Sequence, residues 1–164
     1  MIFGVNDLGL IGSGLFFDDL ALGMRWHSPG RTLLEADLAT YINLTWFTEE
    51  LFTNLHDRTS HAIQGRPVPA LLVMAFAEGL IVPTLARAGL AFLHTDMEVH
   101  ASTGVGDTIH VACEVIEVRL TSKGDRGLVR TRNIVLNQND RPVLTYQPLR
   151  LLRLRAAQDQ TTGA

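Results

Sequence analysis

The stretch from residue 46 to 64 holds the side chains best suited to acid–base chemistry. Two adjacent carboxylates, Glu49 and Glu50, are followed closely by Asn54 and His56. Histidine titrates near neutral pH and is the most common general base in enzymes, and a nearby carboxylate can orient it. We therefore predict His56 as a base, with Glu49 and Glu50 as its partners. Asn54 either contacts a substrate or caps a turn.

Two further residues of this stretch, Asp57 and His61, are weaker candidates for the same role. The alternative for every member is structural. A lone loop histidine is commonly solvent-exposed or locally hydrogen-bonded, and Glu49-Glu50 also fits a solvated helical turn. Loops of this length in compact domains are often functional, and both interpretations stay open.

The sequence predicts no metal centre and no disulfide framework. Apart from His56 and His61, the histidines occur singly, without the paired spacing of metal ligands; they are His27, His94, His100 and His110. Cys113 is the single cysteine and lies in a strand-like alternation, so we expect it to be a small buried hydrophobic residue.

Length and composition indicate one globular domain. The chain has 164 residues, of which 46% are hydrophobic and 19% charged, and a net charge of −3 gives no general attraction to nucleic acid. Residues 119–155 carry nine basic side chains against two acidic ones. These either form solvated strand faces or a basic surface for a phosphate-bearing ligand or an acidic carrier protein. The apolar N-terminus lacks a basic region and contains Asp7, so we expect no secretory signal and a cytoplasmic protein.

The element that must position the loop is the apolar segment that follows it. Residues 68–82 are apolar on every side except at Glu78, which is typical of a helix buried in a core or a membrane. Glu78 in mid-segment, Pro69, Pro83 and the strand-like sequence that follows favour the core helix of a soluble domain. A shorter amphipathic helix is predicted over residues 35–44, with acidic residues at its positive end.

After Gly89 the hydrophobic period changes to two, which predicts strands over residues 108–120, 128–138 and 142–155. Antiparallel strands after one buried helix define an α+β domain whose sheet curls around that helix. We assign residues 1–15 to an N-terminal arm, 16–155 to the domain and 156–164 to a flexible tail. Because such a sheet leaves an edge and a face uncovered, we expect a homodimer.

Several motifs then resemble those of the MaoC-like hot-dog family. They are Arg31-Thr32-Leu33-Leu34-Glu35-Ala36-Asp37, Gly65-Arg66-Pro67-Val68, Gly106-Asp107-Thr108-Ile109, Asp125-Arg126-Gly127-Leu128-Val129 and Asn137-Gln138. The resemblance covers residues 16–155. It implies a hot-dog domain, a dimer with its active site at the interface, and an acyl group carried on coenzyme A or on the phosphopantetheine of an acyl carrier protein. No other cofactor is implied.

The chain departs from the family in its catalytic motif. Family hydratases carry an Asp and a His, spaced five apart, just after the first helix. An alignment anchored on Leu44-Thr45 places Phe47 and Phe52 at these positions. An alignment anchored on Leu55-His56 keeps the histidine but puts Leu51 in place of the aspartate. The dyad is intact in neither alignment.

The resemblance also implies roles at the start of the central helix. Helix N-termini present free N–H groups that stabilise developing negative charge. The N–H of Leu71, joined by that of Ala70, is expected to polarise the thioester oxygen. Substrate-contacting residues are expected at Trp46, Phe47, Phe52, Asn54 and Arg66, with the aromatic rings suited to a short or medium acyl chain.

The predicted activity is conjugate addition of a small nucleophile to C3 of a 2,3-unsaturated acyl thioester, thioester hydrolysis, or both. The missing dyad favours the branch of the family that adds an amine such as glycine and then hydrolyses the thioester, or a simple thioesterase. Two alternatives stay open. One is an ordinary (R)-specific enoyl-thioester hydratase or dehydratase, and the other is a non-catalytic hot-dog subunit that binds acyl thioesters.

Overall fold

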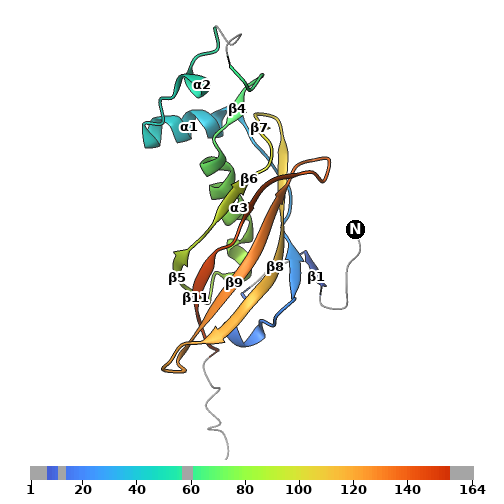
Figure 1. Cartoon of the computed structure of the whole chain (residues 1–164), viewed down its shortest axis with the longest axis vertical. Helices are drawn as coiled ribbons and strands as arrows, with labels where there is room; N and C mark the ends of the chain where they lie inside the picture. Colours follow the sequence, from blue (N-terminus) through green and yellow to red (C-terminus); the bar gives the residue numbers. More distant parts are fainter. Residues whose placement is uncertain (1–6, 11–13, 57–60, 156–164) are drawn as a thin grey trace, which may run out of the picture.

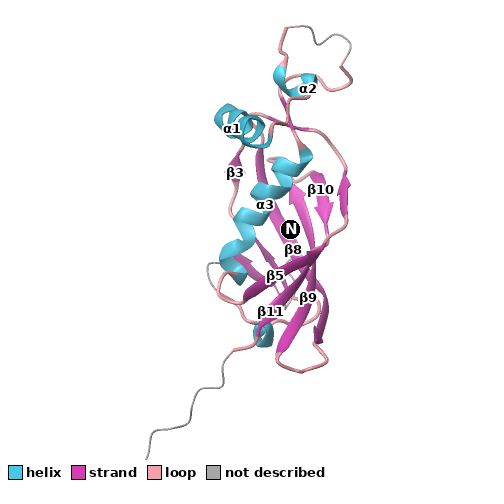
Figure 2. Cartoon of the chain, turned by 90° about the vertical axis from the view of Figure 1, so that its left-hand side faces the viewer, coloured by secondary structure: helices cyan, strands magenta, loops and turns pink. Residues whose placement is uncertain are grey.

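A long helix lies across the concave face of a curved sheet (Figures 1 and 2). The structure is a computed structural model that describes residues 7–10, 14–56 and 61–155. The helix is α3 (Ala70–Leu85), and α1 (Glu35–Thr45), α2 (Glu50–Thr53) and a 3-10 turn, η1 (Phe17–Asp19), accompany it. The strands are β1 (Asp7–Leu10), β2 (Arg25–His27), β3 (Arg31–Thr32), β4 (Pro67–Val68), β5 (Gly89–His94), β6 (Met97–Val99), β7 (Thr103–Gly104), β8 (Thr108–Leu120), β9 (Arg126–Leu136), β10 (Pro142–Tyr146) and β11 (Leu149–Arg153).

The main sheet runs in the order β1-β2-β8-β9-β10-β6, and β11 continues beside β9 with β5 at its outer side. Its central pair, β8 and β9, is antiparallel, with Cys113 opposite Asn133 and Val111 opposite Val135. Among the described strands of this sheet, β1 departs from the pattern because it pairs with β2 in parallel. The hot-dog prediction, an antiparallel sheet around a central helix, is confirmed.

The alternation of the two long strands explains the core. Ile109, Val111, Cys113 and Val115 of β8 are buried, and the residues between them are only partly so. Residues one apart on a strand point to opposite faces, so this set faces α3. Burial raises the pKa of the Cys113 thiol, as expected for the small buried hydrophobic residue predicted from the sequence.

The central helix is buried on one side only. Leu72, Val73, Ala77, Ile81 and Leu85 face the sheet. On the other side, Leu71 and Val82 are 53% and 52% exposed. The expectation that the helix is buried on all sides is therefore wrong for the single protomer. No described helix is both long and apolar enough to cross a bilayer.

Three of the five motifs that resemble the family meet at one corner of the fold. Leu33 N–H donates to the Asp107 carbonyl (2.8 Å) and Gly106 N–H donates to the Leu33 carbonyl (2.8 Å). The Asp107 carboxylate accepts from Gly104 N–H (2.7 Å) and from the Gln138 amide (2.8 Å). Gly106 has a φ of 95°, a conformation that glycine adopts without strain. These contacts fix the start of α1 against β8.

The predicted last strand, residues 142–155, is divided into β10 and β11. The two halves are separated by Gln147 and Pro148, and proline has no N–H to donate to a sheet. Both halves pair with β9, and on the other side β10 pairs with β6 and β11 with β5. The edge formed by β5 and β6 is exposed along its whole length.

Leu38→Ala should lower the free energy of unfolding by about 2–5 kcal/mol, because Leu38 in α1 is fully buried and its loss leaves a cavity. Leu44→Ala in the same helix is the matched control, since Leu44 is 80% exposed. Urea denaturation of both variants measures the difference. Equal losses would show that α1 does not pack on the core as described.

Candidate active site

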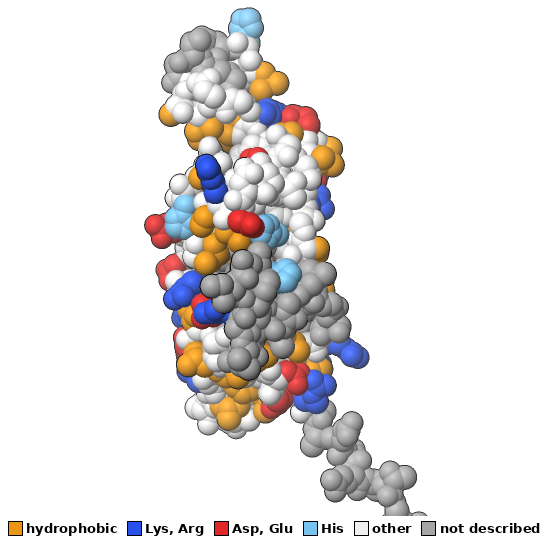
Figure 3. All heavy atoms as spheres, turned by 90° about the vertical axis from the view of Figure 1, so that its right-hand side faces the viewer, with side chains coloured by type: hydrophobic (Ala, Val, Ile, Leu, Met, Phe, Trp, Pro, Cys, Tyr) orange, Lys and Arg blue, Asp and Glu red, His pale blue; other side chains and the backbone are white. Residues whose placement is uncertain are grey.

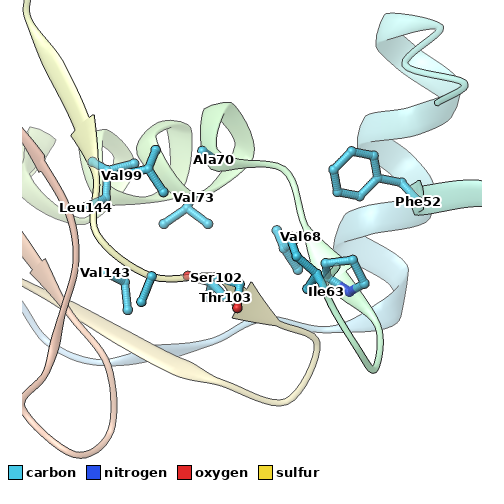
Figure 4. A pocket seen from close by; sticks show the side chains of 12 residues that line it. Phe52, Ile63, Val68, Ala70, Val73, Val99, Ser102, Thr103, Val143 and Leu144 are labelled. Carbon is cyan, nitrogen blue, oxygen red and sulfur yellow. The ribbon is translucent and has the colours of Figure 1, made fainter. Parts of the chain in front are cut away.

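An apolar cavity of about 130 Å³ lies at the N-terminal end of α3 (Figure 4). Side chains from α2, the β4–β7 pair, α3, β6 and β10 point into it from different directions. The lining residues are Phe52, Ile63, Pro67, Val68, Ala70, Val73, Val99, Ala101, Ser102, Thr103, Val143 and Leu144. None of these is titratable, so the described part of the chain offers an apolar chamber without an acid or base in its wall.

The start of α3 borders this cavity. The carbonyl of Pro69 accepts from Leu72 N–H (2.9 Å) and Val73 N–H (3.1 Å), which closes the first turn. The N–H groups of Ala70 and Leu71 precede these bonds and have no partner within the helix. Ala70 lines the cavity, whereas the Leu71 side chain is exposed. A carbonyl oxygen at this helix end would meet free donors and the positive end of the helix dipole.

The small β4–β7 sheet sets the position of the helix start. Val68 pairs with Thr103 and Pro67 with Gly104, and all but Gly104 of these are buried. The next residue along the chain, Pro69, caps α3. Because β7 leads into the corner around Asp107, the donors of α3 are tied to the main sheet through a short, buried connection.

Arg66 ties two elements together beside the cavity. Its guanidinium donates to the Glu35 carboxylate of α1, at 2.6 Å from Nη2 and 3.0 Å from Nε, and also to the Phe52 carbonyl. The hydrogen bond from Arg66, and then its charge, lower the pKa of Glu35. Arg66 therefore holds α1 and the end of α2 in place, and a substrate contact at Arg66 stays a prediction.

The three predicted aromatic residues have different environments. Phe52 is buried and lines the cavity. The ring centroid of Phe47 is 5.8 Å from that of Tyr41 and 5.4 Å from that of Phe52. Phe47 therefore packs against Phe52. Trp46 is 84% exposed and ends α1 in a left-handed conformation with a φ of 57°. The structure thus brings two of the three together.

The polar loop candidates lie outside the cavity wall. Asn54 donates to the Glu50 carboxylate (2.7 Å) and its side-chain oxygen accepts from His56 N–H (2.9 Å). The His56 side chain is exposed. Glu49 and Glu50 line a shallow surface pocket with His61 rather than with His56. Asp57 lies outside the described residues. The catalytic roles of Glu49, Glu50 and His56 stay predictions.

Sequence reasoning missed the apolar wall contributed by β6, β10 and the segment before β7. Val99, Val143 and Leu144 come from these parts of the chain, together with the hydroxyl-bearing Ser102 and Thr103. A hydrophobic pattern marks such residues as core or strand, and only their position beside the helix start distinguishes them as a cavity wall. The sequence held no signal for that distinction.

The basic side chains between residues 119 and 155 are mostly paired within the chain. Arg119 and Arg130 contact Glu117 at 2.8 Å and 3.1 Å, and Arg132 contacts Glu114 at 3.4 Å. Figure 3 shows basic, acidic and hydrophobic side chains mixed on the side of the molecule that lies to the right in Figure 1. These pairings favour solvated strand faces over a basic binding surface.

Comparisons with known proteins agree with this architecture. The beta-methylmalyl-CoA dehydratase of Chloroflexus aurantiacus is 30% identical over 135 residues, which are 81% of this chain and 38% of that enzyme. A MaoC domain protein from the same organism has a TM-score of 0.83 at 28% identity, covering 94% of this chain and 45% of that one. The chain thus spans less than half the length of these two relatives.

A MaoC-like dehydratase from Rhodospirillum rubrum matches in fold, with a TM-score of 0.80 at 22% identity over 88% of this chain and 100% of its own. No protein-family model matches the chain. The fold and site together define a single hot-dog domain with a cavity at its central helix. The chain is similar in sequence and in fold to proteins of the MaoC-like hot-dog family.

Arg66→Met should return the pKa of Glu35 toward its ordinary value of 4.5, because the hydrogen bond that lowers it is removed. A depressed carboxyl pKa stabilises the fold above the unfolded-state pKa, and this contribution is lost as the pH falls through the folded-state pKa. The free energy of unfolding of the variant should therefore fall less on acidification than that of the wild type. NMR titration of the carboxyl group measures the shift.

Arg31→Met is the matched control, since it breaks the Arg31–Asp37 pair of 2.8 Å at the start of the same helix. It should leave the pKa of Glu35 unchanged. If the Glu35 pKa stays depressed without Arg66, the tie between α1 and α2 is not the interaction described.

Proposed function

We propose that the chain is an acyl-thioester enzyme of the hot-dog hydratase or dehydratase type. The observation that carries the proposal is the apolar cavity at the start of α3, where the N–H groups of Ala70 and Leu71 have no partner within the helix. An acyl group fits the apolar chamber, and its thioester oxygen then accepts from the helix end. The relative from Chloroflexus aurantiacus is a dehydratase whose name gives a coenzyme A substrate, which supports the same class of reaction.

The size of the cavity favours a short acyl group. Its volume of about 130 Å³ is slightly below the roughly 150 Å³ that accommodates benzene in an engineered protein cavity. Val73 and Leu144 stand in its wall, and an apolar lining suits a hydrocarbon chain rather than a charged one. The carrier beyond the thioester would be coenzyme A or a phosphopantetheine arm.

The chemistry follows from polarisation of the thioester carbonyl. Donors aimed at the oxygen stabilise the enolate that forms when a nucleophile adds to C3 of a 2,3-unsaturated acyl group. The reverse elimination passes through the same enolate. A base must prepare the nucleophile, and His56 is the proposed group because it follows Phe52, which lines the cavity, by four residues. Water is the simplest nucleophile, and an amine such as glycine is the second.

The proposed working form is a homodimer that covers the open side of α3 and the edge strands. Exposed apolar side chains continue from the helix onto this edge; they are Leu71, Val82, Leu90, Phe92, Leu93, Met97 and Val99. Apolar surface of this extent commonly marks an interaction site. Val99 also lines the cavity, so a partner at this face would complete its wall.

A second candidate is a non-catalytic subunit that binds acyl thioesters and pairs with a catalytic hot-dog chain. The favouring observation is that the cavity wall described here has no titratable side chain. Crotonyl-coenzyme A with water or glycine separates the two functions, using wild type and His56→Ala. Addition or thiol release by the wild type, lost in the variant, supports the enzyme. Binding without either reaction supports the subunit.

Leu71→Pro should lower the rate constant of the acyl-thioester reaction by about 10²–10³, since it deletes one donor to the enolate oxygen. Proline is tolerated in the first turn of a helix, where the N–H has no intrahelical partner. Leu71→Ala is the matched control because it removes an exposed side chain and keeps the N–H. Steady-state kinetics, with circular dichroism to verify folding, distinguishes the two.

Equal rates for the two Leu71 variants would remove Leu71 N–H from the proposed mechanism. Ala70→Pro then tests the neighbouring donor, at the first helical position that proline favours.

Val82→Asp should convert the dimer to monomers by placing a charge in the proposed interface. Leu44→Asp is the control, because Leu44 lies on α1 and is 80% exposed, compared with 52% for Val82. Sedimentation velocity measures the mass of each. A wild type that sediments as a monomer at micromolar concentration contradicts the proposed assembly.

A further inference from the structure

A row of four buried side chains, three of them large and polar, crosses the concave face of the sheet beneath α3. Trp26 of β2 lies opposite Cys113 of β8, Cys113 opposite Asn133 of β9, and Asn133 opposite Tyr146 of β10. Directly opposed residues share one face of a sheet, so all four point toward the helix. We call these four residues the polar rung. Each is at most 3% exposed.

Three members of the polar rung carry polar atoms without a hydrogen-bond partner among the described residues. They are Trp26 Nε1, both side-chain polar atoms of Asn133, and the Tyr146 hydroxyl. Burying such groups unpaired costs free energy, and native proteins rarely leave them so. These polar atoms therefore lie together within a core whose other side chains are mainly apolar.

An ion pair lies above the polar rung. Arg150 Nη2 is 2.6 Å from both carboxylate oxygens of Glu78, and Arg150 Nη1 reaches Thr131 Oγ1 at 3.4 Å. Glu78 and Asn133 lie close enough to Tyr146 to affect its pKa, which burial and then the Glu78 charge raise. Neither neighbour meets the Tyr146 hydroxyl in hydrogen-bonding geometry.

The ion pair also borders an opening. A cavity of about 240 Å³ is lined by Glu78 and Arg150 together with apolar residues of α3 and the start of β5, among them Ile81, Val82 and Gly89. This cavity is distinct from the proposed acyl cavity, whose helix residues are Ala70 and Val73. It provides a path from the outside to the ion pair.

We propose that the polar rung is a binding site for water molecules, which enter beside Glu78 and Arg150 and bridge Trp26 Nε1, Asn133 and the Tyr146 hydroxyl to the ion pair. A buried water needs two to four polar partners, and the rung with the ion pair supplies them. The site takes a small, uncharged hydrogen-bonding molecule, since the Arg150–Glu78 pair already balances its own charges. It does not depend on the acyl-thioester function.

The stabilities of Tyr146→Phe and Asn133→Leu test this proposal. If water bridges these groups, each variant loses hydrogen bonds, and the ratio of folded to unfolded protein should fall by about 5- to 30-fold. If the rung is dry, removing unpaired polar atoms should leave that ratio equal or raise it, which overturns the proposal. Tyr41→Phe, at a half-buried tyrosine of α1, is the control and should change the ratio little.

A crystal structure of the wild type gives the second readout. Density for single water molecules within hydrogen-bonding distance of Asn133 and Tyr146 supports the proposal. An empty rung, or density for a larger bound molecule that native mass spectrometry also detects, overturns it. Both readouts are independent of any enzyme assay, so a protein that is inactive on acyl thioesters is tested equally well.

Discussion

The packing of α3 on one curved sheet is the constraint on which the rest of the structure depends. A helix that is apolar on all sides has more hydrophobic surface than one sheet can cover, so Leu72, Val73 and Ala77 are buried while Leu71 and Val82 stay exposed. The same packing places the first turn of the helix beside β7 and the wall of β10. The cavity at Ala70 therefore follows from where the helix begins on the sheet, and the uncovered side follows from what the sheet cannot reach.

Much of this arrangement could be predicted because local and global patterns agree. The strand of residues 108–120 was predicted to its end residues, since strict alternation specifies both its conformation and its buried face. The helix over residues 35–44 was confirmed with one residue added. Gly106-Asp107 and Leu33 act at one corner through backbone hydrogen bonds, which is why short motifs far apart in the sequence were informative about fold.

The site was less predictable because its residues are not marked by their type. Phe52 was identified from a position in an alignment, yet Val99 and Leu144 read as ordinary strand residues until the fold places them around the helix start. Arg66 was expected to meet substrate, which stays a prediction, and the sequence did not indicate its contacts with Glu35 and the Phe52 carbonyl. Contacts between elements distant in sequence decide both cases, and no local pattern encodes them.

The apolar character of the cavity wall constrains the proposed mechanism. A carbonyl bound at Ala70 is polarised more strongly in a dry chamber than in water, because low dielectric strengthens the interaction with the helix end. A charged acid or base in that wall would carry a large desolvation penalty, so placing it on a loop at the rim costs less. His56 and the carboxylates of α2 lie on such a loop, outside the chamber. In the proposed mechanism, the oxyanion site in the apolar chamber and the acid–base group on the solvated loop are therefore separate, which lowers the cost of desolvation.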